Sequence, residues 1–163
     1  MRYLARLIPL AFLFILLLSG CGVTRKVAHP VKTTEQTLGH PPTLDLNVDM
    51  QPDANDNSPV AFDVVLAKDK ALLKQLTAMS AADWFKKRAQ IKRDQQAKIE
   101  VYSWEWVPGH PVGKVTVPVT VEVLGVVGFA NYATAGDHRA VLALSGSDDI
   151  TFKESDFMVA PGK

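Results

Sequence analysis

The stretch TLDLNVDM, residues 43–50, decides the fold class, because apolar and polar side chains alternate along it without a break. Its apolar members are Leu44, Leu46, Val48 and Met50. Successive side chains of a β-strand point to opposite faces of the sheet, so this pattern predicts a strand with one apolar and one solvated face. We therefore expect a mainly β protein.

Further strands are predicted along the rest of the chain. The segment QPDANDNS, residues 51–58, is dense in turn formers, and PVAFDVVLA, residues 59–67, again has apolar residues at alternate positions. Later segments of β character are IEVYSWEWV, KVTVPVTVEVL, GVVGFANYA, RAVLALSG and DITFKESDFMV. Many short strands separated by turns indicate a β-sandwich. Pro118 cannot donate to a sheet ladder, so we expect the valine-rich strand at an edge or broken at this residue.

A helical pattern interrupts the strands at about residues 69–98. Four apolar residues recur there at helical spacing: Leu72, Leu73, Leu76 and Met79. Ser80 and Asp83 have the spacing of a capping box, which predicts the start of a second helix with Trp84 and Ile91 on nearly one side. The sequence therefore predicts a short helical insertion in the sandwich.

The N-terminus has the features of a secretory signal. Arg2 and Arg6 precede an apolar run at residues 7–18, which is shorter than the roughly 20 residues that a membrane-spanning helix needs. The end of the run, Leu-Ser-Gly-Cys, resembles the lipobox of bacterial lipoproteins. We expect residues 1–20 to be a lipoprotein signal peptide and Cys21, the only cysteine, to be acylated rather than a free thiol.

The expected mature chain has two parts. Residues 21–42 contain prolines and glycines without apolar periodicity and predict a flexible linker, and residues 43–163 form the sandwich domain. Gly22 occupies the position where, by resemblance to enterobacterial lipoproteins, an aspartate would retain the protein in the inner membrane.

The chain carries 18 Lys and Arg against 17 Asp and Glu, a balance that argues against a nucleic-acid partner.

The sequence offers no recognisable catalytic or metal-binding motif. The four histidines, His29, His40, His110 and His138, are scattered and none has metal-ligand spacing. Asp137 and His138 are either a general-base pair or a turn aspartate beside a solvated histidine, and we favour the second interpretation. We expect a protein that is not an enzyme and has no cofactor or metal.

An aromatic stripe gives one alternative binding function. Tyr102, Trp104 and Trp106 repeat at every second position and would share one face of a strand. Exposed, they would form a stacking platform for the sugar rings of peptidoglycan; buried, they would belong to the core, which is the commoner use of large aromatic residues.

A basic cluster gives a second candidate surface. The segment KKRAQIKRD on the second predicted helix would meet phosphates of lipid A or an acidic partner if its charges were focused on one stripe. At about 100° per residue they spread around most of the helix, which favours a solvated helix that protrudes from the sandwich.

Several of these motifs together resemble a known family. The lipobox, the polar loop ending in NDNSPV, the helical start SAADWF, the VPG turn and the strand GVVGFANY look like TssJ, the outer-membrane lipoprotein family of the type VI secretion system. The similarity spans Leu44 to about Leu144. It implies a transthyretin-like β-sandwich with a short helical insertion, anchored in the outer membrane and facing the periplasm.

The resemblance also implies a partner and a site. The partner is the periplasmic domain of TssM, the inner-membrane component, and the contact involves the loop between the first two strands. Here the polar positions of that loop are Asp53, Asn55, Asp56 and Asn57. A solvated turn is the competing interpretation of these residues. The alternative functions are an envelope lipoprotein that binds peptidoglycan glycan and a pilotin-like secretion chaperone.

Overall fold

A computed structural model describes residues 42–162 of the chain. The predicted signal peptide, the predicted acylation site Cys21 and the predicted linker up to residue 41 lie outside the described residues, as do His29 and His40. Within residues 42–162, no helix has both the length and the apolar character required to cross a bilayer.

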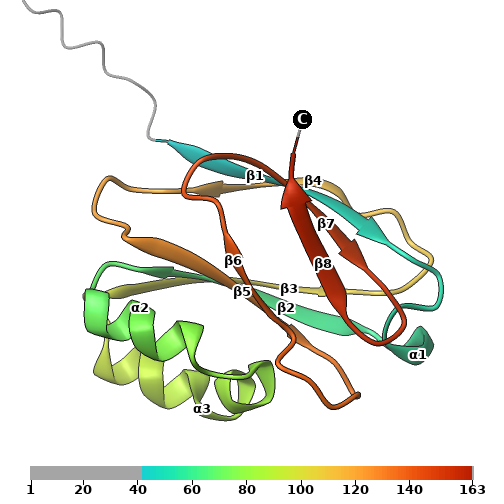
Figure 1. The fold of residues 1–163 in the computed structure, drawn as a ribbon, viewed down its shortest axis with the longest axis horizontal. Coiled ribbons are helices and arrows are strands. Elements are labelled where there is room, and N and C mark those ends of the chain that lie inside the picture. The colour runs from blue at the N-terminus through green and yellow to red at the C-terminus, as the bar shows by residue number, and fades with distance from the viewer. Residues whose placement is uncertain (1–41, 163) are drawn as a thin grey trace, which may run out of the picture. The chain divides into compact units, whose positions relative to one another are not determined.

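Two four-stranded sheets form a β-sandwich, as the sequence predicts (Figure 1). The first sheet has the order β4-β1-β7-β8 and the second has the order β3-β2-β5-β6. Strands of the first sheet are β1 (Thr43–Met50), β4 (Gly113–Pro118), β7 (Gly146–Phe152) and β8 (Phe157–Pro161). Strands of the second sheet are β2 (Val60–Ala67), β3 (Ile99–Trp106), β5 (Gly125–Asn131) and β6 (Arg139–Leu142). Only the β1–β7 pairing is parallel among these strands of the described chain.

The main hydrophobic core lies between the two sheets. All four apolar residues of the alternating stretch in β1 are buried there, which confirms the face predicted for Leu44, Leu46, Val48 and Met50. Phe62 of β2 lies at the centre, with its ring 5.3 Å from that of Phe152 and 5.5 Å from that of Trp106. Aromatic rings at such distances add stabilisation beyond their buried area.

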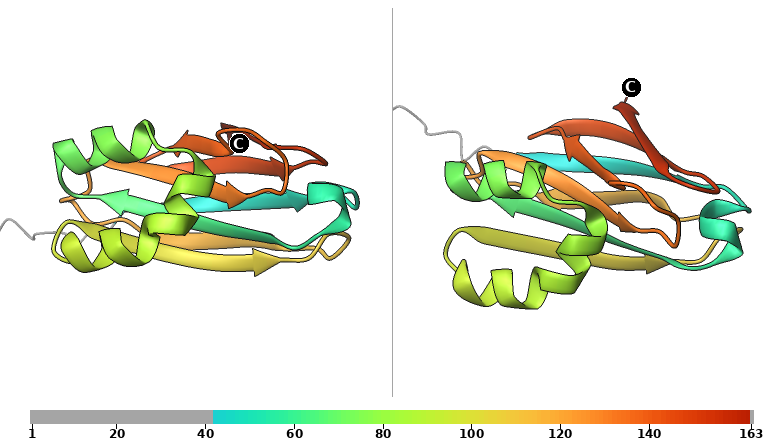
Figure 2. Two further views of the ribbon diagram at one scale, coloured as in Figure 1. Left: turned by 90° about the horizontal axis from the view of Figure 1, so that it is seen from below. Right: turned by 60° about the horizontal axis from the view of Figure 1, so that its bottom comes forward.

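A second hydrophobic cluster covers the outer face of the β3-β2-β5-β6 sheet. The helices α2 (Lys70–Thr77) and α3 (Ala81–Asp94) lie on the side of this sheet that faces away from the other sheet (Figure 2). Trp84 of α3 is fully buried and stacks on Phe129 of β5 at a centroid distance of 5.2 Å. Because β2 and β5 are covered on both faces, nearly all of their residues are buried.

Side-chain caps fix where the two helices begin. The Asp69 carboxylate accepts from the Leu72 backbone N–H at 3.0 Å, and this bond lowers the pKa of Asp69 below its ordinary value. The Ser80 hydroxyl accepts from the Asp83 N–H at 3.2 Å, so the cap predicted for the second helix is present. The buried residues Trp84 and Ile91 share the side of α3 that faces the sheet, as predicted.

The valine-rich segment differs from the continuous pattern in the sequence. β4 ends at Pro118 and lies at an edge of its sheet, so both expectations for this proline are met. The alternation continues to Val123 in the sequence, but residues 119–124 form a turn rather than a strand. Val119 and Val123 are nevertheless buried in the core, which explains their apolar character without a ladder.

Candidate partner-binding surface

The loop between β1 and β2 contains an unusual left-handed turn. Its single helical turn, α1 (Ala54–Asn57), has backbone φ angles of 49° at Asn55, 54° at Asp56 and 59° at Asn57. Asparagine and aspartate tolerate this conformation better than other residues with a side chain. The local sequence Asn-Asp-Asn therefore suits this turn, whose backbone conformation would be strained for most other residue types.

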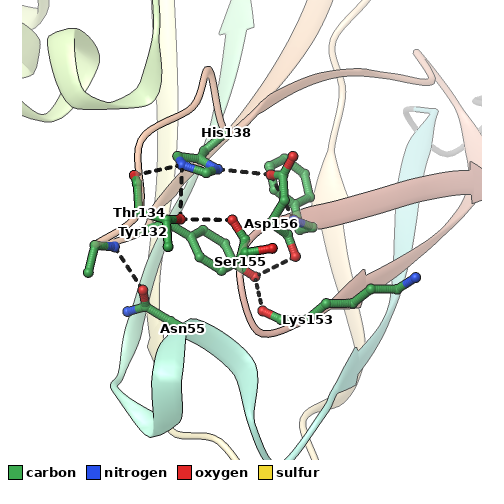
Figure 3. A network of polar contacts seen from close by, with 9 residues as sticks. Asn55, Tyr132, Thr134, His138, Lys153, Ser155 and Asp156 are labelled. Atoms are coloured by element: carbon green, nitrogen blue, oxygen red, sulfur yellow. Dashed lines mark hydrogen bonds and ion pairs between the residues drawn. The ribbon is translucent and has the colours of Figure 1, made fainter.

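Asn55 fixes this turn to the rest of the domain. Its side chain is 4% exposed, and its Nδ2 donates to the Pro59 carbonyl at 3.1 Å while its Oδ1 accepts from the Ala133 N–H at 2.8 Å. Its backbone N–H donates to the Lys153 carbonyl at 3.2 Å. One residue thus joins the β1–β2 loop to two other loops at this end of the sandwich (Figure 3).

Tyr132 and Thr134 join the same loops from the other side. The Tyr132 hydroxyl lies within hydrogen-bond distance of the carbonyls of Lys153, at 3.0 Å, and Asp156, at 2.9 Å. The Thr134 hydroxyl donates to the Ser155 carbonyl at 2.8 Å. Burial raises the pKa of the Tyr132 hydroxyl above its ordinary value, because the phenolate would lose its hydration.

His138 is buried within this network, so the expectation of a solvated histidine is wrong. It is 5% exposed, its ring stacks on Tyr132 at 4.9 Å, and its Nδ1 lies 2.9 Å from the Asp156 carboxylate (Figure 3). Its Nε2 lies 2.9 Å from the Thr134 carbonyl. Asp137 is not its partner and instead pairs with Arg139 at 3.3 Å. The histidine closes the β5–β6 loop over the core rather than forming a general-base pair with Asp137.

The residues predicted to bind a partner separate into two groups. Asp53, just before the left-handed turn, is exposed, and so are Asp56 and Asn57 within it. The Asn55 side chain is instead turned into the loop network. The exposed surface therefore consists of two carboxylates and one amide held on a fixed backbone. Asn55 positions this surface and does not belong to it.

A pocket that the sequence does not reveal opens at the end of the β3-β2-β5-β6 sheet that lies next to the left-handed turn. Its volume is about 350 Å³. The residues that line it are Glu105, Trp106, Val107, His110, Pro111 and Val112. Trp106 pairs with Val60, which follows the left-handed turn by a few residues. The Pro108-Gly109 turn signal places a loop here, but only the tertiary fold shows that the loop leaves a hollow.

The aromatic stripe of β3 packs against the core. Trp106 is 9% exposed, and Tyr102 and Trp104 are partly buried against the main cluster. The three rings stack in series, with centroid distances of 6.4 Å between Tyr102 and Trp104 and 5.8 Å between Trp104 and Trp106. The structure therefore favours the core interpretation over a sugar-stacking platform.

The arrangement offers no metal site in the part of the chain that the structure describes. Among residues 42–162, no group of three or more His, Cys, Asp or Glu side chains is placed to hold a metal ion. The surface at the left-handed turn is instead suited to polar contacts with a macromolecule, because its carboxylates are solvated and its backbone is fixed.

Comparison with known proteins identifies the architecture. No protein-family model matches the sequence, and no curated protein matches it. Among solved structures, the type VI secretion lipoprotein TssJ1 from Pseudomonas aeruginosa has a TM-score of 0.59 at 14% identity, with 76% of this chain and 98% of that chain covered. The chain has the TssJ fold.

Two further solved structures of type VI secretion proteins are similar to this chain. Serratia marcescens Lip, a membrane-bound component of the type VI secretion system, has a TM-score of 0.57 at 14% identity, with 76% of this chain and 99% of that chain covered. A structure of the C-terminal domain of the type VI secretion protein TssM from EAEC has a TM-score of 0.52 at 16% identity, with 74% of this chain and 99% of that chain covered. The TssJ fold predicted from the short motifs is thereby confirmed.

Proposed function

We propose that this protein is a TssJ-family lipoprotein of a type VI secretion membrane complex, anchored in the outer membrane and facing the periplasm. The observation that carries the proposal is the TssJ fold, which covers 98% of the Pseudomonas TssJ1 chain. The lipobox ending at Cys21 supports it independently, since it predicts an acyl anchor in front of this domain. The role is mechanical coupling and requires no catalysis.

The partner in this proposal is the periplasmic domain of a TssM-like inner-membrane protein. The exposed Asp53, Asp56 and Asn57 form the polar part of the docking surface. The neighbouring pocket around Val107 and Pro111 accepts an apolar side chain of the partner. Because Asn55 fixes the turn beforehand, docking costs little ordering entropy. Confinement of both proteins in the periplasm and several copies per complex raise the effective concentration.

Calorimetric titration tests the docking surface. The soluble domain, residues 42–163, is titrated with the periplasmic region of the cognate TssM, beside the variant Asp53→Ala, Asp56→Gly and Asn57→Gly. Glycine replaces the two residues at positive φ because it accepts the left-handed conformation without strain. We expect the affinity of the variant to fall by about tenfold or more, because contacts at the centre of an interface dominate its binding energy. Asn55 is retained so that the turn keeps its shape.

A matched control removes the same chemistry from the opposite end of the domain. Asp94, Gln96 and Glu122 are exposed there, and their replacement by alanine should leave the affinity unchanged. Equal binding by the wild type and the loop variant would move the site elsewhere on the domain. If the folded wild-type domain fails to bind, the TssM proposal is wrong, and binding to a short segment of a secretion pore would favour the pilotin alternative.

Membrane fractionation tests the anchor. Cys21→Ser removes the thiol that would be acylated, so the variant should leave the outer-membrane fraction after a high-salt wash while the wild type remains there. Ser19→Ala, which keeps the cysteine, serves as the control and should sediment with the membrane. Retention of the Cys21→Ser protein in the washed membrane would contradict an acyl tether.

A further inference from the structure

We propose that a pocket between α3 and β3 binds a phosphate-bearing anion. The pocket has a volume of about 290 Å³ and lies on the helix-covered side of the β3-β2-β5-β6 sheet. Its lining consists of Asp63, Arg88, Ala89, Lys92 and Ser103. None of these residues belongs to the surface at the left-handed turn, so this proposal is independent of partner docking.

A buried carboxylate holds the Arg88 guanidinium in place. Asp63 is fully buried in β2, and its two oxygens accept from Arg88 Nη1 at 3.1 and 2.9 Å. Trp84 Nε1 donates to the same carboxylate at 2.8 Å. The guanidinium also lies 4.8 Å from the centre of the Phe85 ring, so its orientation is fixed on two sides.

The fixed guanidinium keeps donors available for a ligand. The Arg88 side chain is 41% exposed, and its Nε and Nη2 have no acceptor among residues 42–162. A guanidinium presents its N–H groups in a rigid fork that matches the oxygens of phosphate. Because the orientation of Arg88 is set before binding, less side-chain entropy is lost when an anion docks.

Lys92 and Ser103 complete a lining that is rich in donors. Lys92 follows Arg88 by one helical turn and has no carboxylate partner within the described chain, whereas Lys87 on another side of α3 pairs with Asp83 at 2.9 Å. Ser103 lies opposite Asp63 in the β2–β3 ladder and is exposed. Asp63 is the only negative group of the lining, and its charge is compensated by Arg88. The pocket therefore carries one net positive charge from Lys92.

The donor set fits phosphate better than a carboxylate. Arg88, Lys92 and Ser103 supply N–H and O–H donors from α3 and β3. A carboxylate has two oxygens, which one guanidinium fork engages, whereas inorganic phosphate has further oxygens for a lysine and a hydroxyl donor. The basic residues spread around α3, as the sequence suggests, and Lys86, Lys92 and Arg93 are all exposed. Arg88 and Lys92 share the side of the helix that lines the pocket.

The test is a titration of the full chain in non-ionic detergent with inorganic phosphate, followed by ¹H–¹⁵N NMR at constant ionic strength with chloride as the balancing ion. We expect saturable shifts at Ser103 and at the Arg88 Nε–H. Lys92→Gln should weaken binding by about tenfold, since it removes a charge-assisted hydrogen bond. Arg93→Gln removes the same charge from an exposed side of the same helix and should change the affinity by less than about twofold.

Two ligands distinguish the sources of the phosphate. Tighter binding of glycerophosphoglycerol, the deacylated headgroup of phosphatidylglycerol, would support the proposal with a lipid headgroup as ligand. Tighter binding of inorganic phosphate would support it with a free phosphate. The Trp84 indole resonance reports that each variant keeps its fold. Absence of saturable shifts, or equal weakening in Lys92→Gln and Arg93→Gln, would overturn the proposal.

Discussion

Asn55 combines a left-handed backbone with a side chain that bonds two separate segments. Its φ of 49° suits asparagine, and its amide uses a donor for Pro59 and an acceptor for Ala133. The sequence identifies QPDANDNS as a turn because the segment is dense in turn-forming residues, which can be recognised without knowledge of the rest of the fold. It does not distinguish the buried Asn55 from the exposed Asp56, because that difference depends on the β5–β6 loop about eighty residues later.

Replacement of Asn55 tests this role. Asn55→Ala leaves the Ala133 N–H and the Pro59 carbonyl without their partner and places alanine at a positive φ, so we expect the free energy of unfolding to fall by about 2–4 kcal/mol. Urea denaturation measures the change. Asn57→Gly, at the exposed end of the same turn, should be neutral or stabilising, because glycine accepts the left-handed conformation without strain. An Asn55→Ala domain as stable as the wild type would contradict the positioning role.

Asp63 shows that the pattern of a strand does not reveal which of its polar residues are buried. It interrupts the apolar segment VAFDVVLA at the position where a strand in an open sandwich would have a solvated side chain. In the structure α3 covers that face, and the carboxylate is buried with Trp84 and Arg88 as partners. A buried charge requires such compensation, which no periodicity in the strand itself can reveal.

At the scale of elements, Trp84 is the largest of the buried side chains that attach α3 to the sheet. Trp84 is fully buried, stacks on Phe129 and donates to Asp63. The helical spacing of Trp84 and Ile91 and the cap at Ser80 are local features, and both are predicted correctly. The surface that this helix covers depends on the position of β2 and β5 in the sheet, which lies beyond the reach of a local pattern.

Removal of that side chain tests the attachment. Trp84→Ala should lower the free energy of unfolding by about 3–5 kcal/mol, the usual cost of deleting a buried large aromatic residue. Lys86→Ala on an exposed side of the same helix should change it by less than about 0.5 kcal/mol. Chemical denaturation of the two variants in parallel gives the comparison. A loss below about 1 kcal/mol for Trp84→Ala would show that the helix is held elsewhere.

The aromatic stripe of β3 illustrates what strand periodicity can decide. Alternation correctly places Tyr102, Trp104 and Trp106 on one face. Whether that face meets the core or solvent depends on which sheet packs against it. The structure places Trp106 against Phe62 and Phe152, so the face belongs to the sandwich interior.

At the scale of the whole molecule, the two hydrophobic clusters share one sheet. β2 contributes Phe62 and Val64 to the cluster between the sheets and Val65 to the cluster beneath the helices. β1 and β7 pair in parallel although about a hundred residues separate them, with Leu44 opposite Gly146. Both clusters contain residues of the β3-β2-β5-β6 sheet, so neither can form without that sheet. We infer that the domain unfolds as one unit.

Fluorine NMR can follow this cooperativity in a single sample. With 5-fluorotryptophan incorporated, Trp84 reports the cluster beneath the helices, whereas Trp104 and Trp106 report the edge and interior of the sandwich. We expect the three native resonances to disappear at one common urea concentration. A lower midpoint for Trp84 alone would show that the helices detach before the sandwich unfolds, and would contradict a single cooperative unit.

The sequence by itself determined most of the strand and helix segments, the cap at Ser80, the interruption at Pro118 and the resemblance that led to the TssJ fold. These features follow from side-chain periodicity, backbone restrictions and short motifs, which act over a few residues. The sequence did not determine that residues 119–124 leave the sheet or that DITFKESDFMV contains the end of β7 and the start of β8. Only the tertiary structure decided the strand order, the burial of Asp63, Asn55 and His138, and the convergence of Arg88, Lys92 and Ser103. Each of these depends on contacts between distant segments, and a local pattern carries no information about which segments meet.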